Sequence, residues 1–191
     1  GRTVCIFPCI HPAAGLYSPE IQSHVAYDFS QLALFLKGDL EPRVLFEDAY
    51  AGQERYIEVT TTVHLDAILK WVAHGTPISI DSEGYPHAPW SLQFSLTPGT
   101  AYLIRRTCPE VLARFGQIMV QRRLRVTYHN ALHDLSINRA LGIEDINELP
   151  FDDTMVMAYL LGIEPQGLKP LCVRHCNMKM DSYDDILGDV S

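Results

Sequence analysis

Two carboxylates one residue apart, Asp81 and Glu83, follow a short apolar run and precede a glycine. The run at residues 78–80 has the composition of a strand. Alternate residues of a strand project to the same side, so both carboxylates should project together from the strand's end. Two like charges this close repel, and either protonation or a hard cation relieves the repulsion. If a cation relieves it, the pair is half of a divalent-metal site for phosphate-ester chemistry.

A third carboxylate, Asp134, lies at the start of a predicted helix that follows a strand ending at Tyr128. Asn130 is the expected cap of this helix, and its spacing of four from Asp134 puts both on one helix face. If the helix start meets the end of the strand at residues 77–82, Asp134 joins the first two carboxylates. Three acids at one point are costly unless metal ions balance them, and oxygen ligands suit Mg²⁺ or Mn²⁺.

The elements that must position these residues follow from hydrophobic periodicity and from turn signals. Strands come first and then alternate with helices, which indicates an α/β fold with a mixed sheet flanked by helices. The turn-rich stretch at residues 37–42 is the expected boundary between residues 1–40 and residues 41–191. Strands are predicted at residues 2–10, 43–46, 56–60, 77–82, 90–96, 100–104 and 124–128. Helices are predicted at residues 18–37, 62–74, 108–120, 130–141, 154–161 and 166–176.

Composition limits the partners that can be expected. The chain has 191 residues, a hydrophobic content of 47% and a net charge of −8, which disfavours broad coating of nucleic acid. No apolar run approaches the roughly 20 residues of a membrane span, so no membrane partner is expected. Six arginines between residues 105 and 125 could track a phosphate backbone or form a solvated helix face and loop. They are Arg105, Arg106, Arg114, Arg122, Arg123 and Arg125.

The five cysteines leave two readings open. Two pairs are spaced four apart with a histidine nearby, and together they could hold zinc. Buried free cysteines in a reducing cytosol are the favoured reading, and a cytoplasmic location is expected. The residues concerned are Cys5, Cys9, His11, Cys172, His175 and Cys176.

Asp153, at the start of the predicted helix over residues 154–161, also has two readings. An aspartate near a helix start is more often a charge at the positive end of the helix dipole than a metal ligand. The ordered set of acidic motifs is more specific than any one of them.

As a set, the residues from about 56 onward resemble the 3′–5′ proofreading exonuclease domain of family A DNA polymerases. That domain is a DEDD exonuclease with a ribonuclease H-like fold. Residues 80–83 match its first motif, residues 90–95 the strand that follows, and residues 129–135 its second motif. Residues 153–155 and 167–169 match the stretch that leads to its third motif.

The family's third motif supplies a tyrosine or histidine and, four residues later, a final aspartate. No such pair follows Leu171, since Tyr183 directly precedes Asp184. The chain also opens at Gly1 inside a strand-like segment. We therefore expect a piece truncated at both ends, with three of four carboxylates and with little or no activity in isolation.

The resemblance implies that Asp81, Glu83 and Asp134 hold two divalent cations, Mg²⁺ or Mn²⁺, and are the catalytic set. It implies a single-stranded DNA 3′ end as substrate, a following polymerase domain as partner, and a bacterial or viral replication context. Asn130 would orient the site or touch the terminal nucleotide. Tyr85, Trp90 and Leu132 have two alternative roles. They could stack on or wedge against unpaired bases, or they could pack in the core.

Residues 9–16 are similar to the last strand and helix of the uracil-DNA glycosylase superfamily, where a His-Pro motif follows a strand. His11 would match the histidine that faces the uracil. A strand-turn-helix with an ordinary loop histidine is the alternative. The first forty residues would then be a strand-helix segment from another domain.

Two functions of different classes follow. The first is a metal-dependent 3′–5′ exonuclease module that proofreads single-stranded DNA ends. The second is a catalytically silent nucleic-acid-binding or structural spacer within a larger replication or repair protein, because a fold can be kept while its site is lost.

Overall fold

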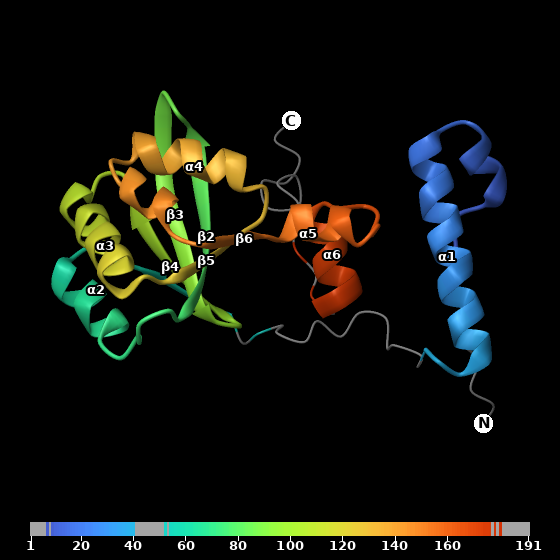
Figure 1. Ribbon diagram of the computed structural model, residues 1–191, viewed down its shortest axis with the longest axis horizontal. Helices are drawn as coiled ribbons and strands as arrows, with labels where there is room; N and C mark the ends of the chain where they lie inside the picture. The colour runs from blue at the N-terminus through green and yellow to red at the C-terminus, as the bar shows by residue number, and fades with distance from the viewer. Residues whose placement is uncertain are drawn as a thin grey trace. The chain divides into compact units, whose positions relative to one another are not determined.

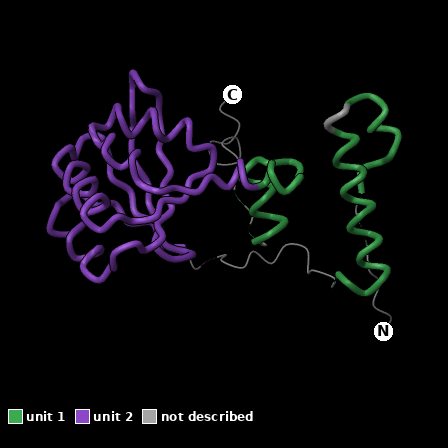
Figure 2. Tube along the Cα trace, viewed as in Figure 1, with its two compact units in different colours: residues 1–49, 158–191 green, residues 50–157 purple. Residues whose placement is uncertain are grey.

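The computed structural model describes residues 7, 9–40, 52, 54–176, 178 and 180. The chain forms two compact units, one of residues 50–157 and one that joins residues 1–49 to residues 158–191 (Figure 2). The strand predicted at residues 43–46 and most of that predicted at residues 2–10 lie outside the described residues. The division into residues 1–40 and 41–191 stays a prediction.

The unit of residues 50–157 is built on a six-stranded mixed sheet (Figure 1). Its strand order is β1-β4-β3-β2-β5-β6, in which β3 is antiparallel to both neighbours and the other pairs are parallel. The strands are β1 (Arg55–Glu58), β2 (Pro77–Tyr85), β3 (Ala88–Thr97), β4 (Thr100–Arg105), β5 (Arg125–Tyr128) and β6 (Phe151–Asp153). The predicted α/β fold with a mixed sheet is confirmed.

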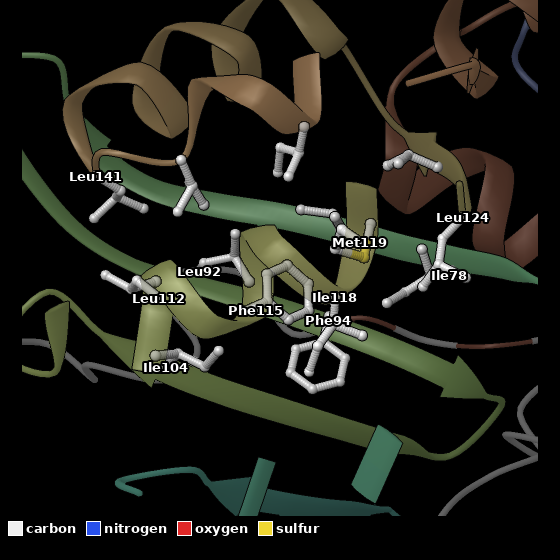
Figure 3. Packing of buried hydrophobic residues seen from close by; sticks show 14 of the residues in the cluster. Ile78, Leu92, Phe94, Ile104, Leu112, Phe115, Ile118, Met119, Leu124 and Leu141 are labelled. Atoms are coloured by element: carbon white, nitrogen blue, oxygen red, sulfur yellow. The ribbon is translucent and has the colours of Figure 1, made fainter. Parts of the chain in front are cut away.

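Helices pack their apolar stripes against one face of this sheet. These helices are α2 (Thr62–Leu69), α3 (Pro109–Arg122), the 3₁₀ turn η2 (Glu144–Glu148) and α4 (Ala131–Ala140). Phe115 of α3 meets Phe94 of β3 at a ring-centroid distance of 4.9 Å, and Met119 is fully buried beside them (Figure 3). Burial of this apolar surface drives the helices onto the sheet.

The other face of the sheet is polar, because the strands alternate. In β2, Ile78 and Ile80 are buried, whereas Asp81 and Glu83 are exposed. Residues paired directly across strands share a face. The register places Gln93 opposite Asp81, and Ser91 opposite Glu83. We call this side of the sheet the polar face.

The unit of residues 1–49 and 158–191 is helical in its described part. The helix α1 (Pro19–Lys37) begins with proline in its first turn and ends at Gly38, which has a φ of 81°. Both features were predicted, and they follow from the fixed φ of proline and the freedom of glycine. No described helix has the length and hydropathy needed to cross a membrane. The remaining elements are η1 (Pro12–Leu16), α6 (Leu168–Leu171), the π-helical turn η3 (Cys172–Cys176) and the second half of α5 (Thr154–Leu160).

The helix predicted over residues 166–176 begins two residues later than expected and changes form along its length. Gly167 is extended, with a ψ of 146°, so α6 begins after it, and the chain then widens into η3. Cys172 in that turn is buried as predicted, but Cys9 and Cys176 are exposed. Across the described residues, no three His, Cys, Asp or Glu side chains form a metal-binding group, and Cys5 lies outside them. The structure therefore gives the zinc reading no support.

Gly84 ends the carboxylate-bearing part of β2. The register shifts between Glu83 and Gly84, which marks a β-bulge, and Gly84 has a φ of 112°. A Cβ at this position would lie 2.6 Å from the carbonyl oxygen of Ala88 and 2.8 Å from the nitrogen of Trp90. Glycine is therefore needed both for its conformation and for the close approach of β3.

We predict that Gly84→Ala destabilises the unit of residues 50–157 well beyond the roughly 1 kcal/mol that a left-handed backbone costs an alanine. Gly75→Ala is the matched control, because Gly75 has a φ of 74° and nothing lies within 4 Å of its Cβ position. Urea unfolding followed by circular dichroism measures both. Equal losses of stability in the two variants would contradict a steric role for Gly84.

Candidate active site

The candidate site lies where β5 stops and β2 continues. Ser79 of β2 pairs with Thr127, and β5 ends one residue later at Tyr128. The end of β2 therefore extends past its parallel neighbour, and α4 contacts it there (Figure 1). The carboxyl ends of parallel strands are where α/β sheets place their ligands.

Asp134 is buried at this junction. Only 1% of its surface is exposed, and its Oδ1 atom has no hydrogen-bond partner. The pKa of this carboxyl is raised from its ordinary 3.8 to about 7, mainly by burial and also by the charge of Asp81, although a hydrogen bond from the Ser82 backbone N–H acts in the opposite direction. An unpartnered oxygen on a buried carboxyl is costly, which makes Asp134 a candidate for a missing ligand.

Asp81 is close enough to Asp134 for the two charges to interact. Asp81 is exposed as a whole residue, but partial desolvation of its carboxylate raises its pKa, the charge of Glu83 raises the pKa further, and His133 lowers it. The predicted meeting of the helix start with the end of β2 is therefore observed. Glu83 follows on the same polar face.

A chain of buried polar side chains holds α4 against β2. Ser82 Oγ, between the two carboxylates of β2, donates to Asn138 Oδ1 at 3.1 Å. Asn138 Nδ2 donates to Tyr128 Oη at 3.2 Å and to Asn147 Oδ1 at 3.1 Å. Asn138 lies four residues after Asp134 and so shares its helix face. Sequence reasoning missed this network, although a polar residue one turn after Asp134 was the available signal.

The start of α4 is held by Asp153 and not by the side chain of Asn130. Asn130 has a φ of 68° and makes no side-chain capping bond. Asp153 instead accepts the backbone N–H groups of Asn130 at 3.1 Å and Ala131 at 2.8 Å. Its Oδ1 also accepts the N–H of Met155 at 2.9 Å, at the start of α5.

Burial alone would raise the pKa of Asp153, but hydrogen bonds from four backbone N–H groups lower it overall. Asp153 therefore caps two helix starts, as the reading of a charge at a helix N-terminus predicted.

The aromatic and apolar side chains predicted to touch bases are exposed, so their reading as core residues is wrong. The exposed fractions are 66% for Tyr85, 70% for Trp90 and 82% for Leu132. Tyr85 stacks on the ring of His87 at a centroid distance of 5.5 Å, near the β2–β3 turn. These side chains leave the core because they occupy outward positions of β2, β3 and α4.

His11 belongs to the other unit. It is exposed, and its Nδ1 accepts the N–H of Ala13 at 3.2 Å. This contact caps η1 and is typical of a loop histidine. The likeness to uracil-DNA glycosylases stays a prediction.

Four of the six clustered arginines have protein partners. Arg105 pairs with Glu58 at 2.7 Å, Arg114 with Asp66 at 2.9 Å, and Arg125 with Asp152 at 2.7 Å. Arg122 donates to the carbonyls of Leu69 and Val72. These four arginines therefore each bind a different part of the protein and do not form one continuous positively charged surface.

The residues at the junction fit a hard divalent cation. Asp134 offers an unpartnered oxygen, and Gln93, opposite Asp81, has a buried Oε1 atom without a hydrogen-bond donor. A hydrated cation would place positive charge next to the unpartnered oxygen of Asp134, and one of its waters would donate a hydrogen bond to Gln93 Oε1. Within the described residues, however, no three His, Cys, Asp or Glu side chains come together as a metal-binding group, so the three predicted ligands are not assembled into a metal site in this structure.

Several solved structures share this fold at low sequence identity. The catalytic core of RRP6 from Trypanosoma brucei matches with a TM-score of 0.57 and 16% identity, over 74% of this chain and 41% of that chain. RNase D from Escherichia coli, an exoribonuclease involved in structured RNA processing, matches with a TM-score of 0.53 and 20% identity, over 68% of this chain and 35% of that one. RNase D from Trypanosoma brucei matches with a TM-score of 0.53 and 13% identity, over 71% and 54%.

These likenesses show the fold alone, and the predicted ribonuclease H-like architecture of a mixed sheet flanked by helices is confirmed. This chain spans about half or less of the length of each of the three structures. No family model matches the sequence, and no curated protein matches it. The likeness to family A polymerases stays a prediction.

We predict that Asp153→Ala lowers the free energy of unfolding by roughly 1–4 kcal/mol, since each of the two lost helix caps costs about 0.5–2 kcal/mol. Thr61→Ala is the control, because Thr61 Oγ1 caps α2 through the single N–H of His64 at 3.2 Å. The pKa of Asp153 is lowered in the folded protein, so its contribution is present at neutral pH and is lost as the pH falls through that lowered value. Urea titrations at pH 7 and pH 3 measure this, and a loss no larger than that of Thr61→Ala would refute the double cap.

We predict that Asp134→Asn stabilises the protein in the presence of a chelator, and increasingly so as the pH rises. The folded-state pKa of about 7 lies above the ordinary 3.8, so folding keeps a proton that the unfolded chain has released. The free energy of unfolding of the wild-type protein therefore falls as the pH rises from 4 to 7. At 1.36 kcal/mol per pKa unit, the loss amounts to at most about 4 kcal/mol. Unfolding of both proteins at pH 4.5 and pH 8 checks this, with exposed Asp145→Asn as the control. A difference that does not change with pH would exclude a raised pKa.

Proposed function

We propose that this chain carries a metal-dependent 3′–5′ exonuclease module of the DEDD type, acting on single-stranded DNA ends. The observation that supports it most is Asp134, a buried carboxylate with an unpartnered oxygen that lies close enough to Asp81 for their charges to interact. A fold shared with known exonucleases adds support without identifying the substrate.

In this proposal, Asp81, Glu83 and Asp134 hold two divalent cations, Mg²⁺ or Mn²⁺. Such ions activate a water and stabilise the leaving 3′ oxygen. Asp134 releases its proton when the site is loaded, because a nearby cation favours the charged form. Gln93 Nε2 donates a hydrogen bond to Ser91 Oγ at 2.9 Å, which orients the side-chain amide. Its Oε1 atom can then accept a hydrogen bond from a water at the site.

The substrate strand would meet exposed side chains beside the carboxylates. Tyr85, Trp90 and Leu132 have the exposure that stacking or wedging on unpaired bases needs. Asn130, at the start of α4, is exposed and could contact the terminal nucleotide.

The biological role that we propose for this nuclease rests on the likeness of the sequence to family A polymerases. In that role the chain is a proofreading module, its partner is a polymerase domain, and its setting is cytoplasmic, in bacterial or viral replication. The exoribonuclease among the similar folds makes RNA the natural comparison substrate.

A silent spacer is the second candidate. The observation in its favour is that, within the described residues, the acidic side chains do not close into a three-ligand group. A spacer would bind nucleic acid or a neighbouring domain without a metal requirement.

The direct test has two readouts. Mn²⁺ binding to the 191-residue chain, followed by electron paramagnetic resonance, should weaken at least about tenfold in Asp81→Ala, because one ligand is lost. Trimming of 5′-labelled single-stranded DNA and RNA in Mg²⁺ or EDTA should be slow for the wild type and slower still for the variant. Asp145→Asn should match the wild type in both assays.

Equal Mn²⁺ affinity in the wild type and Asp81→Ala would refute the metal site. Nucleic-acid binding without any metal-dependent trimming, even with an extended chain, would favour the spacer. Faster trimming of RNA than of DNA would keep the nuclease and remove the polymerase context.

A further inference from the structure

The polar face carries a positively charged side chain, Arg105, in the same cross-strand row as Glu83. Glu83 of β2 pairs with Ser91 of β3, and Ser91 pairs with Arg105 of β4. These three side chains share one face of the sheet, because directly paired residues do. Neighbouring strands are about 4.8 Å apart, so the backbone of Arg105, two strands away, lies roughly 10 Å from that of Glu83 across the polar face.

The guanidinium of Arg105 is only partly engaged. Its Nε donates to Glu58 Oε1 at 2.7 Å, and both side chains are exposed. Arg125 differs, since its Nε and Nη2 both bind Asp152. A guanidinium has five N–H donors, and in the described part of the chain no other bond from the Arg105 side chain is found. Its terminal amino groups are therefore open to a further anion.

A strand of nucleic acid that reaches the carboxylates must have its charge balanced on the way. Asp81 and Glu83 repel phosphates unless cations lie near, while Ser91 and Gln93 between them and Arg105 are neutral. Neighbouring phosphates of one strand are separated by at least about 3.4 Å along its axis, so about 10 Å is spanned by three nucleotides or fewer. Arg105 lies at a suitable distance for a phosphate upstream of the terminal nucleotides.

We propose that Arg105 binds a backbone phosphate of a single strand whose 3′ end lies at Asp81, Glu83 and Asp134, and that Glu58 competes with the phosphate for it. This inference rests on the proposed function. It assigns Arg105 as a positioning residue for the strand, and it makes Glu58 a residue that weakens binding.

The chain offers a matched control on its helical side. Arg114 of α3 pairs through Nε with Asp66 of α2 at 2.9 Å, and its geometry repeats that of Arg105 with Glu58. Both ion pairs are exposed and are expected to contribute little to stability. Arg114 lies on the helices that cover the apolar face of the sheet, away from the polar face.

The experiment measures binding of 5′-fluorescein-labelled dT10 to the 191-residue chain by anisotropy, with Ca²⁺ present as a hard cation to neutralise the carboxylates, across a series of KCl concentrations. Arg105→Ala should weaken binding about fivefold or more at low salt and reduce the slope of log K against log salt by about 0.7. Glu58→Gln should tighten binding about two- to threefold, because it frees Arg105. Arg114→Ala and Asp66→Asn should stay within twofold of the wild type.

Equal slopes for Arg105→Ala and Arg114→Ala would overturn the inference, and so would weaker binding by Glu58→Gln. The Glu58→Gln variant keeps the test valid if Arg105→Ala folds poorly, because its predicted effect is of opposite sign. If the wild type binds dT10 and the arginine variants do not differ, only the role of Arg105 fails. If the wild type binds no oligonucleotide, the proposed function fails with it.

Discussion

The candidate site depends on how α4 is held against the end of β2, and a buried polar network does this. Ser82, Asn138 and Tyr128 are all buried, and each has a hydrogen-bond partner in the others. Such a network is favourable only when all of its members are satisfied, so it permits one register of α4 on β2 and disfavours its neighbours. Asp134, one helical turn before Asn138, is thereby placed beside Asp81.

Asp153 fixes the other end of the same arrangement. It lies in β6, a strand of three residues, and its carboxylate binds the N–H groups that begin α4. The start of α4 carries the positive end of the helix dipole, so a carboxylate there is favourable. With the N-terminus held by Asp153 and the next turn by Asn138, Asp134 lies between two fixed points. The short β6 is itself held by its parallel pairing with β5.

Local patterns predicted most strands and the main helices of the sheet unit, and they singled out three carboxylates as candidate ligands, because period and spacing are properties of neighbouring residues. They did not predict β6 or the real cap of α4, since Asp153 acts on residues 22 and 23 positions earlier. The arginine cluster was ambiguous for the same reason, because Arg114 finds its partner 48 residues away. Contacts between distant segments depend on the assembled fold, and no local pattern reports them.

The stability cost of Asp134 bears on the choice between an enzyme and a spacer. A buried carboxyl with an unpartnered oxygen and a pKa near 7 weakens the folded protein at neutral pH. A spacer needs only the shape of α4 on β2, and Asn138 and Asp153 already supply that shape, so an asparagine at position 134 would serve it better. Sites that break the rules of stable folding in this way are typically sites that bind a ligand. A cation bound beside Asp81 would turn the same carboxyl from a cost into a contribution to stability, since anything that binds only the folded state stabilises it. The burial of Asp134 therefore favours a metal-binding function over a purely structural one.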